Sequence, residues 1–103
     1  MHFDLHAQNM DLSDSLRDHV EQKLLTPVKR LVDDPSARLE VRLRNLGHAK
    51  DGRHHEVHAH FSAPRDIHLD ITEVDEDMYR AVDVAHHRLQ EALRRQLEKR
   101  RNH

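Results

Sequence analysis

The sequence has no cysteine and no tryptophan, and its 103 residues include only two glycines, three prolines, two phenylalanines and one tyrosine. Without cysteine, the chain can form no disulfide, no thiol nucleophile and no thiolate zinc site. Two glycines are too few for a glycine-rich phosphate loop. No apolar run approaches the roughly 18 residues of a membrane span, and the first nine residues lack the pattern of a signal peptide. We therefore expect a cytoplasmic protein.

Charged residues are abundant and nearly balanced in number. Seventeen Lys and Arg against nineteen Asp and Glu give a formal charge of -2, and apolar residues make up 36% of the chain. A chain of this length forms one domain, and the regular spacing of its apolar residues distinguishes it from a disordered segment. We expect a single domain over residues 1–103. Any nucleic-acid partner must be inferred from where the charges lie, because the total is slightly negative.

Four segments alternate apolar and polar residues, which is typical of strands with one covered face. These segments are residues 2–7, 38–44, 54–61 and 67–72. The loop 45–53 contains Gly47 and the pair Asp51-Gly52, which predicts a hairpin between the second and third strands. The polar positions of the four segments would share the uncovered face of one sheet.

Two further segments show the spacing of amphipathic helices. The first follows Ser13, a predicted N-cap, and carries the apolar stripe Leu16, Val20, Leu24, Val28 and Leu31. Pro27 interrupts this stripe, so we expect a kink or a restart there with Thr26 as a second N-cap. The second helix is predicted from Asp75 onward, with acidic residues at its start and basic residues at its end.

This order of elements predicts an α+β fold, β-α-β-β-β-α, in which a four-stranded sheet has two helices packed on one face. A right-handed crossover makes the first two strands parallel, and the last three form an antiparallel meander. Tyr79, the single tyrosine, is predicted as a partly buried ring that closes the core where the last strand meets the second helix. We favour this position over stacking on a nucleic-acid base, because stacking surfaces usually present more than one ring.

The second helix carries a row of basic residues along one edge. Arg80, His87, Arg94 and Arg101 are seven residues apart, and Arg88 and Arg95 lie beside them. Such a row binds phosphate through counterion release, whereas the alternative is a solvated face with Glu91–Arg95 and Arg94–Glu98 pairs. His86 is interpreted as part of this row. If the two helices lie side by side, three residues of the first helix extend it: Lys23, Lys29 and Arg30.

Histidine occurs twelve times, and half of these residues are predicted on the uncovered sheet face. They are His2, His6, His54, His58, His60 and His68, with Asp4, Glu56 and Asp70 among them. Imidazole and carboxylate groups can bind a divalent metal or change charge near neutral pH. Their spacing matches no known helical or finger-type metal motif, so a polar sheet face is favoured and a metal site is the alternative. Nothing assembles a catalytic site, and we predict neither an enzyme nor a cofactor.

Several short patterns together resemble the ribosome hibernation promoting factor and protein Y family. They are Asn9-Met10-Asp11-Leu12-Ser13, Leu16-Arg17, Lys23-Leu24, Glu56-Val57, Asp77-Met78-Tyr79 with Ala81 and Asp83, and Arg88-Leu89 to Gln96-Leu97 with Lys99 and Arg100. The resemblance spans nearly the whole chain and implies the same β-α-β-β-β-α fold. It also implies a translation-silencing factor that occupies the decoding region of the small ribosomal subunit and obstructs messenger and transfer RNA.

The resemblance and the basic row together give the candidate RNA-binding residues. They are Lys23, Lys29, Arg30, Arg80, His87, Arg88, Arg94, Arg95, Lys99 and Arg101. The chain ends after the second helix, so it is expected to be a short form without a C-terminal dimerisation domain. Short forms favour ribosome pairing with a separate ribosome modulation factor, and off the ribosome we expect a monomer. The net charge of -2, the interrupting Pro27 and the many histidines depart from the family pattern.

Overall fold

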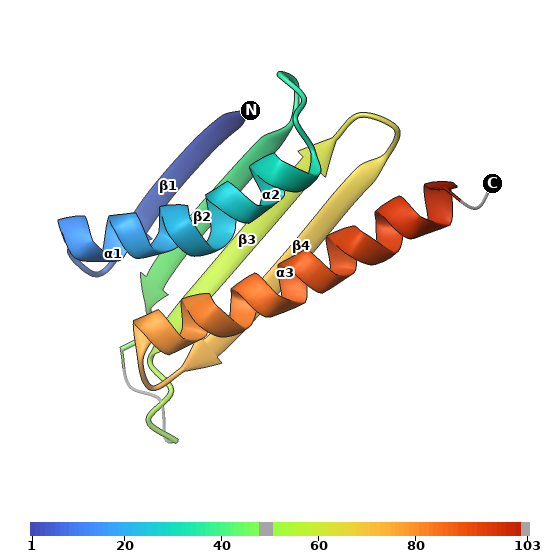
Figure 1. The fold of residues 1–103 in the computed structure, drawn as a ribbon. Helices are drawn as coiled ribbons and strands as arrows, with labels where there is room; N and C mark the ends of the chain where they lie inside the picture. The colour runs from blue at the N-terminus through green and yellow to red at the C-terminus, as the bar shows by residue number, and fades with distance from the viewer. Residues whose placement is uncertain (48–50, 102–103) are drawn as a thin grey trace.

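Four strands form one mixed sheet, and the helices lie together on one of its faces (Figure 1). The structure is a computed structural model that describes residues 1–47 and 51–101. Its elements are β1 (His2–Gln8), α1 (Asp14–Val20), the π-helical turn η1 (Glu21–Leu25), α2 (Thr26–Leu31), β2 (Arg38–Asn45), β3 (His55–Ala63), β4 (Ile67–Asp75) and α3 (Met78–Arg101). β1 pairs with β2 in parallel, and β2, β3 and β4 pair antiparallel in the order β1-β2-β3-β4. The predicted fold class and strand directions are confirmed.

The strand alternation places the apolar side chains under the helices. In the β2–β3 pair, Leu39 lies opposite Phe61 and Leu43 lies opposite Val57, and all four side chains are fully buried. Their neighbours along each strand face the other side of the sheet, as the two-residue period requires. The apolar stripes of the helices complete this core, and burial of a side chain of this size contributes roughly 1.5–3 kcal/mol.

The ends of some elements differ from the sequence prediction. β4 continues to Asp75, three residues beyond the predicted end at residue 72, so Asp75 belongs to the strand and not to the helix. α3 begins at Met78, where the Oδ1 of Asp77 accepts a hydrogen bond from the Tyr79 amide at 3.1 Å. In the β2–β3 hairpin, Gly52 has a φ of +81°, which glycine adopts without strain. Residues 48–50 of the predicted hairpin loop lie outside the described residues.

The first helix passes through Pro27 without the predicted second N-cap. The cap at Ser13 is confirmed, since its Oγ accepts from the Leu16 amide at 3.1 Å. Thr26 has helical angles, φ -57° and ψ -45°, and the expectation that it caps a new helix is wrong. The turn before Pro27 widens to η1, in which the Thr26 amide donates to the Glu21 carbonyl five residues back. This wider turn fits the proline ring, which would crowd the preceding turn of a regular α-helix.

Candidate nucleic-acid interface

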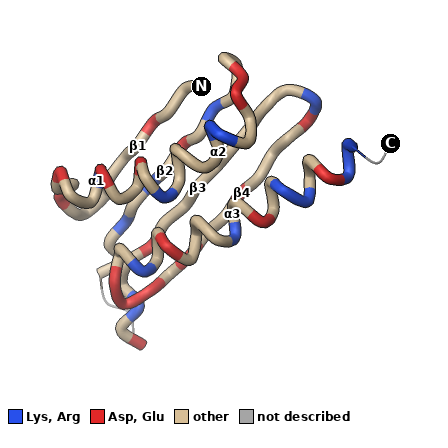
Figure 2. The backbone as a smooth tube through the Cα atoms, in the orientation of Figure 1, with Lys and Arg blue, Asp and Glu red and all other residues tan. Residues whose placement is uncertain are grey.

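The two helical segments lie side by side and run in the same direction (Figure 1). A row of contacts joins them: the Tyr79 hydroxyl lies 2.9 Å from Ser15 Oγ, and His19 Nε2 donates to Asp83 Oδ1 at 2.8 Å. Further along, α3 reaches the η1 turn at Lys23. Because the residue numbers increase together on both sides, the basic carboxyl-terminal turns of α2 and α3 point to the same end of the molecule (Figure 2).

Two arginines in the first half of α3 form ion pairs with acidic residues of the edge strand β4. Arg80 Nη1 lies 3.5 Å from Asp75 Oδ1. Arg88 Nη1 donates to the Thr72 carbonyl at 2.9 Å and to the Glu73 carboxylate. These contacts fasten the helix to the sheet edge, and the two carboxylates offset the two arginine charges.

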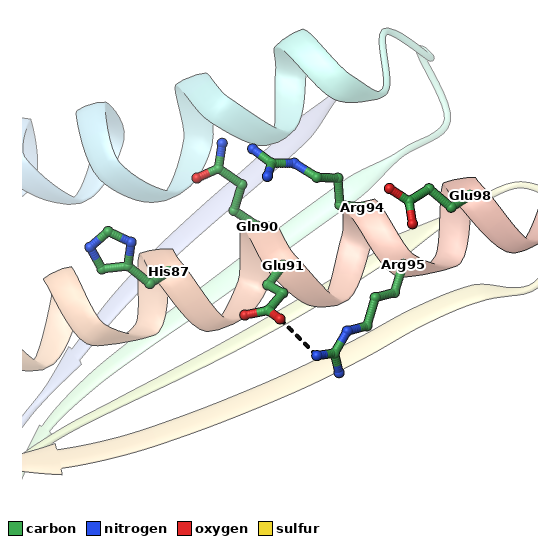
Figure 3. Close-up of a pocket in the computed structure, with 6 residues that line it drawn as sticks. All are labelled: His87, Gln90, Glu91, Arg94, Arg95 and Glu98. Atoms are coloured by element: carbon green, nitrogen blue, oxygen red, sulfur yellow. Dashed lines mark hydrogen bonds and ion pairs between the residues drawn. The ribbon is translucent and has the colours of Figure 1, made fainter.

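The second half of α3 presents its polar residues around a shallow hollow of about 490 Å³ (Figure 3). Glu91 and Arg95 form the predicted pair, with Oε1 and Nη2 2.7 Å apart. The predicted Arg94–Glu98 pair is not among the ion pairs of the described residues, and the Arg94 side chain extends away from Glu98. Arg94 is exposed and keeps its charge available for a ligand.

The ten predicted RNA-binding residues therefore fall into two groups. Arg80, Arg88 and Arg95 are bound to carboxylates of this chain. The other seven form no ion pair within residues 1–47 and 51–101, and they are Lys23, Lys29, Arg30, His87, Arg94, Lys99 and Arg101. Four of the seven lie in the last turns of α2 and α3, so free positive charge gathers where the two helical segments end.

His86 lies between the helices and not on the exposed basic edge. Its Nδ1 donates to the Lys23 carbonyl at 2.6 Å, and its ring stacks at a tilt on the exposed His87, with centroids 5.0 Å apart. Burial between the helices lowers the pKa of His86. The sequence interpretation that assigned both histidines to the basic row is therefore wrong for His86, since only packing decides which of two adjacent residues turns inward.

Tyr79 is also placed differently from its prediction. The ring is 38% exposed, so it does not close the core near the last strand. It packs edge-on against His19, with ring centroids 5.0 Å apart, while its hydroxyl bonds Ser15. Tyr79 thus joins α3 to α1, and the predicted position in the core is wrong because the residue lies one step round the helix from the buried Met78.

Five of the six predicted histidines lie on polar strand positions of the uncovered sheet face, whereas His54 precedes β3, which begins at His55 and not at the predicted residue 54. His58 Nε2 and His60 Nδ1 both donate to Asp70 Oδ1, at 3.0 and 2.9 Å. The hydrogen bond from His60 is the main cause that lowers the pKa of Asp70. Across the part of the chain that is described, no three His, Asp or Glu residues are arranged to hold a metal ion. The metal-binding alternative therefore has no support.

No helix within the described ranges is both long and apolar enough to span a bilayer. Among solved structures, the N-terminal domain of protein Y from Thermus thermophilus is similar in fold, with a TM-score of 0.72 and 26% sequence identity. That match covers 92% of this chain and 98% of the other. A ribosomal subunit interface protein from Coxiella burnetii also has a TM-score of 0.72, with coverage of 95% and 99%, and its 22% identity supports the fold alone.

No curated protein matches this chain in sequence. A family model described as sigma 54 modulation protein / S30EA ribosomal protein matches residues 3–101. The sequence resemblance, the strand order and the structural matches agree with that result. Because the family model covers nearly the whole chain, the chain belongs to the family of sigma 54 modulation and S30EA ribosomal proteins.

Proposed function

We propose that this chain binds the small ribosomal subunit at its decoding region and silences translation by obstructing messenger and transfer RNA. Family membership and the likeness to a protein Y domain support binding to the ribosome. In this proposal residues 1–103 act as one ribosome-binding domain in the cytoplasm, monomeric when free. Pairing of ribosomes with a separate ribosome modulation factor belongs to the same proposal, which includes no enzymatic activity and no cofactor.

The observation that carries the RNA contact is the gathering of unpaired cations at the carboxyl-terminal ends of the helices. Lys29 and Arg30 lie in the last turn of α2, and Lys99 and Arg101 lie in the last turn of α3. On α3, the exposed Arg94 lies about one and a half turns before Lys99. Phosphate contacts supply most of the affinity of such surfaces, and the planar guanidinium suits phosphate oxygens.

The net charge of -2 does not oppose this proposal, because basic residues outnumber acidic ones where the helices end. Lys29, Arg30, Lys99, Arg100 and Arg101 lie there against Asp33, Asp34 and Glu98. Asp75 and Glu73 are already bound to arginines in the first half of α3, and Asp14 lies in the first turn of α1. An RNA strand that approaches the far ends of the helices therefore meets mainly positive charge (Figure 2). The three paired arginines contribute less to RNA affinity than the seven unpaired residues in this proposal.

Co-sedimentation with purified small ribosomal subunits at low and moderate salt tests the proposal. We expect the wild-type chain to bind at low salt and to lose affinity steeply as salt rises. Arg94→Glu should weaken binding tenfold or more, whereas Arg42→Glu, the same charge change on the uncovered sheet face, should change it less than twofold. A cell-free translation reaction should follow the same ranking of inhibition.

Each other result contradicts a definite part of the proposal. An absence of wild-type binding at low salt would exclude the ribosome as the partner. Equal losses in Arg94→Glu and Arg42→Glu would show that only net charge matters, and unchanged binding in Arg94→Glu would move the interface away from α3. Binding without inhibition of translation would leave the decoding-region assignment wrong.

A further inference from the structure

A hollow of about 530 Å³ opens where α2, α3 and the β3–β4 turn meet. Figure 1 shows these three segments converging at the end of the molecule that holds the C-terminus. We infer that this hollow is a docking site for an acidic peptide segment of a partner protein that carries aliphatic side chains. The site shares Arg101 with the RNA contact proposed above but does not depend on that contact.

The floor of the hollow is aliphatic and continues the core to the surface. Leu31, Val32 and Leu97 are each half-buried and pack against the fully buried cluster. Val32 ends α2 in an extended conformation, φ -134° and ψ 97°, which takes its side chain out of the helical stripe. Pro64 and Ile67 close the side formed by the β3–β4 turn. No described element covers this floor, so a partner's aliphatic side chain would remove apolar surface from water on both molecules.

The rim of the hollow is basic. Arg65, Arg100 and Arg101 line it, and none of them forms an ion pair with any residue that the structure describes. Among the described residues of the lining, Asp34 is the one acidic residue, and its Oδ1 already accepts from the Ser36 amide at 2.8 Å and from Ser36 Oγ at 2.7 Å. Three guanidinium groups outnumber the single Asp34 carboxylate, which is already hydrogen-bonded to Ser36, so the rim favours a ligand that brings negative charge.

The combination of floor and rim favours a peptide over RNA. Phosphates would satisfy the arginines but would leave the aliphatic floor exposed, and bases bind single-strand surfaces by stacking on aromatic rings. None of the described residues that line the hollow is aromatic. A Leu or Ile side chain fits the floor, and flanking Asp or Glu carboxylates accept paired hydrogen bonds from the guanidinium groups.

Backbone amide shifts of the ¹⁵N-labelled chain would test this inference by titration with the peptide acetyl-Asp-Glu-Leu-Leu-Glu-Asp-amide. We expect saturable shifts at Val32, Ala63 and Leu97, with a dissociation constant below about 1 mM. A control peptide with Ser in place of both Leu residues should bind at least tenfold more weakly. Hexauridylate should shift the residues around Arg94 and leave Val32 and Ala63 in the hollow unchanged.

Matched variants separate the site from general attraction. Arg65→Glu should weaken the leucine peptide at least fivefold, whereas Arg42→Glu on the uncovered sheet face should change it less than twofold. An absence of shifts in the hollow, equal binding of the serine peptide, or stronger shifts there with hexauridylate would each overturn the inference. None of these measurements uses ribosomes, so failure of the proposed function would be recognised separately.

Discussion

The ring of His86 on α3 supplies the hydrogen bond that Pro27 withholds from the neighbouring helix. In an α-helix, the Lys23 carbonyl would accept from the amide of residue 27, and proline has no amide hydrogen. His86 Nδ1 donates to that oxygen at 2.6 Å. The proline that widens the first helix therefore also creates the acceptor that ties it to α3.

We expect His86→Ala to lower the free energy of unfolding by about 1–3 kcal/mol, because the Lys23 carbonyl loses its partner. In a Pro27→Ala background the new amide can bond that carbonyl, so the same change should cost less. Urea unfolding of the four chains measures this coupling, and His87→Ala is the control. An equal cost in both backgrounds would contradict the link between Pro27 and His86.

Stability should fall in mild acid because of His86. Burial lowers the pKa of His86 in the folded chain, so the unfolded chain binds this proton more readily. The resulting loss begins as the pH falls through the ordinary histidine value of about 6.5 and is complete below the folded pKa. His86→Gln can still donate to Lys23 but does not titrate, so it should lose less stability than wild type between pH 7.5 and 5.5. If urea unfolding showed the same loss of unfolding free energy in wild type and His86→Gln over this pH range, groups other than His86 would be responsible for the loss.

Arg88 and Arg94 should separate stability from binding. Arg88→Gln removes the contacts to Thr72 and Glu73 and should lower the free energy of unfolding by about 0.5–1 kcal/mol, since the pair is half-exposed. Arg94→Gln should leave the melting temperature unchanged and weaken binding to small subunits about threefold to tenfold. If Arg88→Gln weakened binding as much as Arg94→Gln did, the division of α3 into paired and unpaired halves would not hold.

Tyr79 should contribute to stability through the packing of α3 against α1 and should not contribute to RNA affinity. Tyr79→Phe loses only the bond to Ser15 and should cost about 0.5 kcal/mol, whereas Tyr79→Ala also loses the contact with His19 and should cost about 1 kcal/mol. Thermal unfolding measures both. Lost binding at an unchanged melting temperature would show instead that the ring contacts RNA.

The sequence was sufficient to predict the strands, which residues of each strand face the core, and the helices, because burial on one face imposes a period of two or 3.6 residues. It was insufficient to predict which side chains meet between the two helical segments or between α3 and the edge of the sheet. The turn before Pro27 depends on the register of hydrogen bonds, and the inward position of His86 depends on how closely the helices pack. That Arg88 is paired and Arg94 is not depends on which edge of α3 lies against β4, and no local pattern encodes that contact.

Acidic residues lie where the helical layer begins, with Asp14 in the first turn of α1 and Asp75 and Asp77 just before α3, and basic residues lie in the last turns of α2 and α3. This separation gives the molecule a permanent electric moment along its length. A polyanion would exert a torque on such a body before contact and would turn its basic end forward. Productive encounters would then need less rotational search, so charge separation can speed association even when the net charge is negative. At an ionic strength of about 0.1 M, charges more than about 10 Å apart are largely screened from each other. Added salt would therefore lower the association rate more than it raises the dissociation rate.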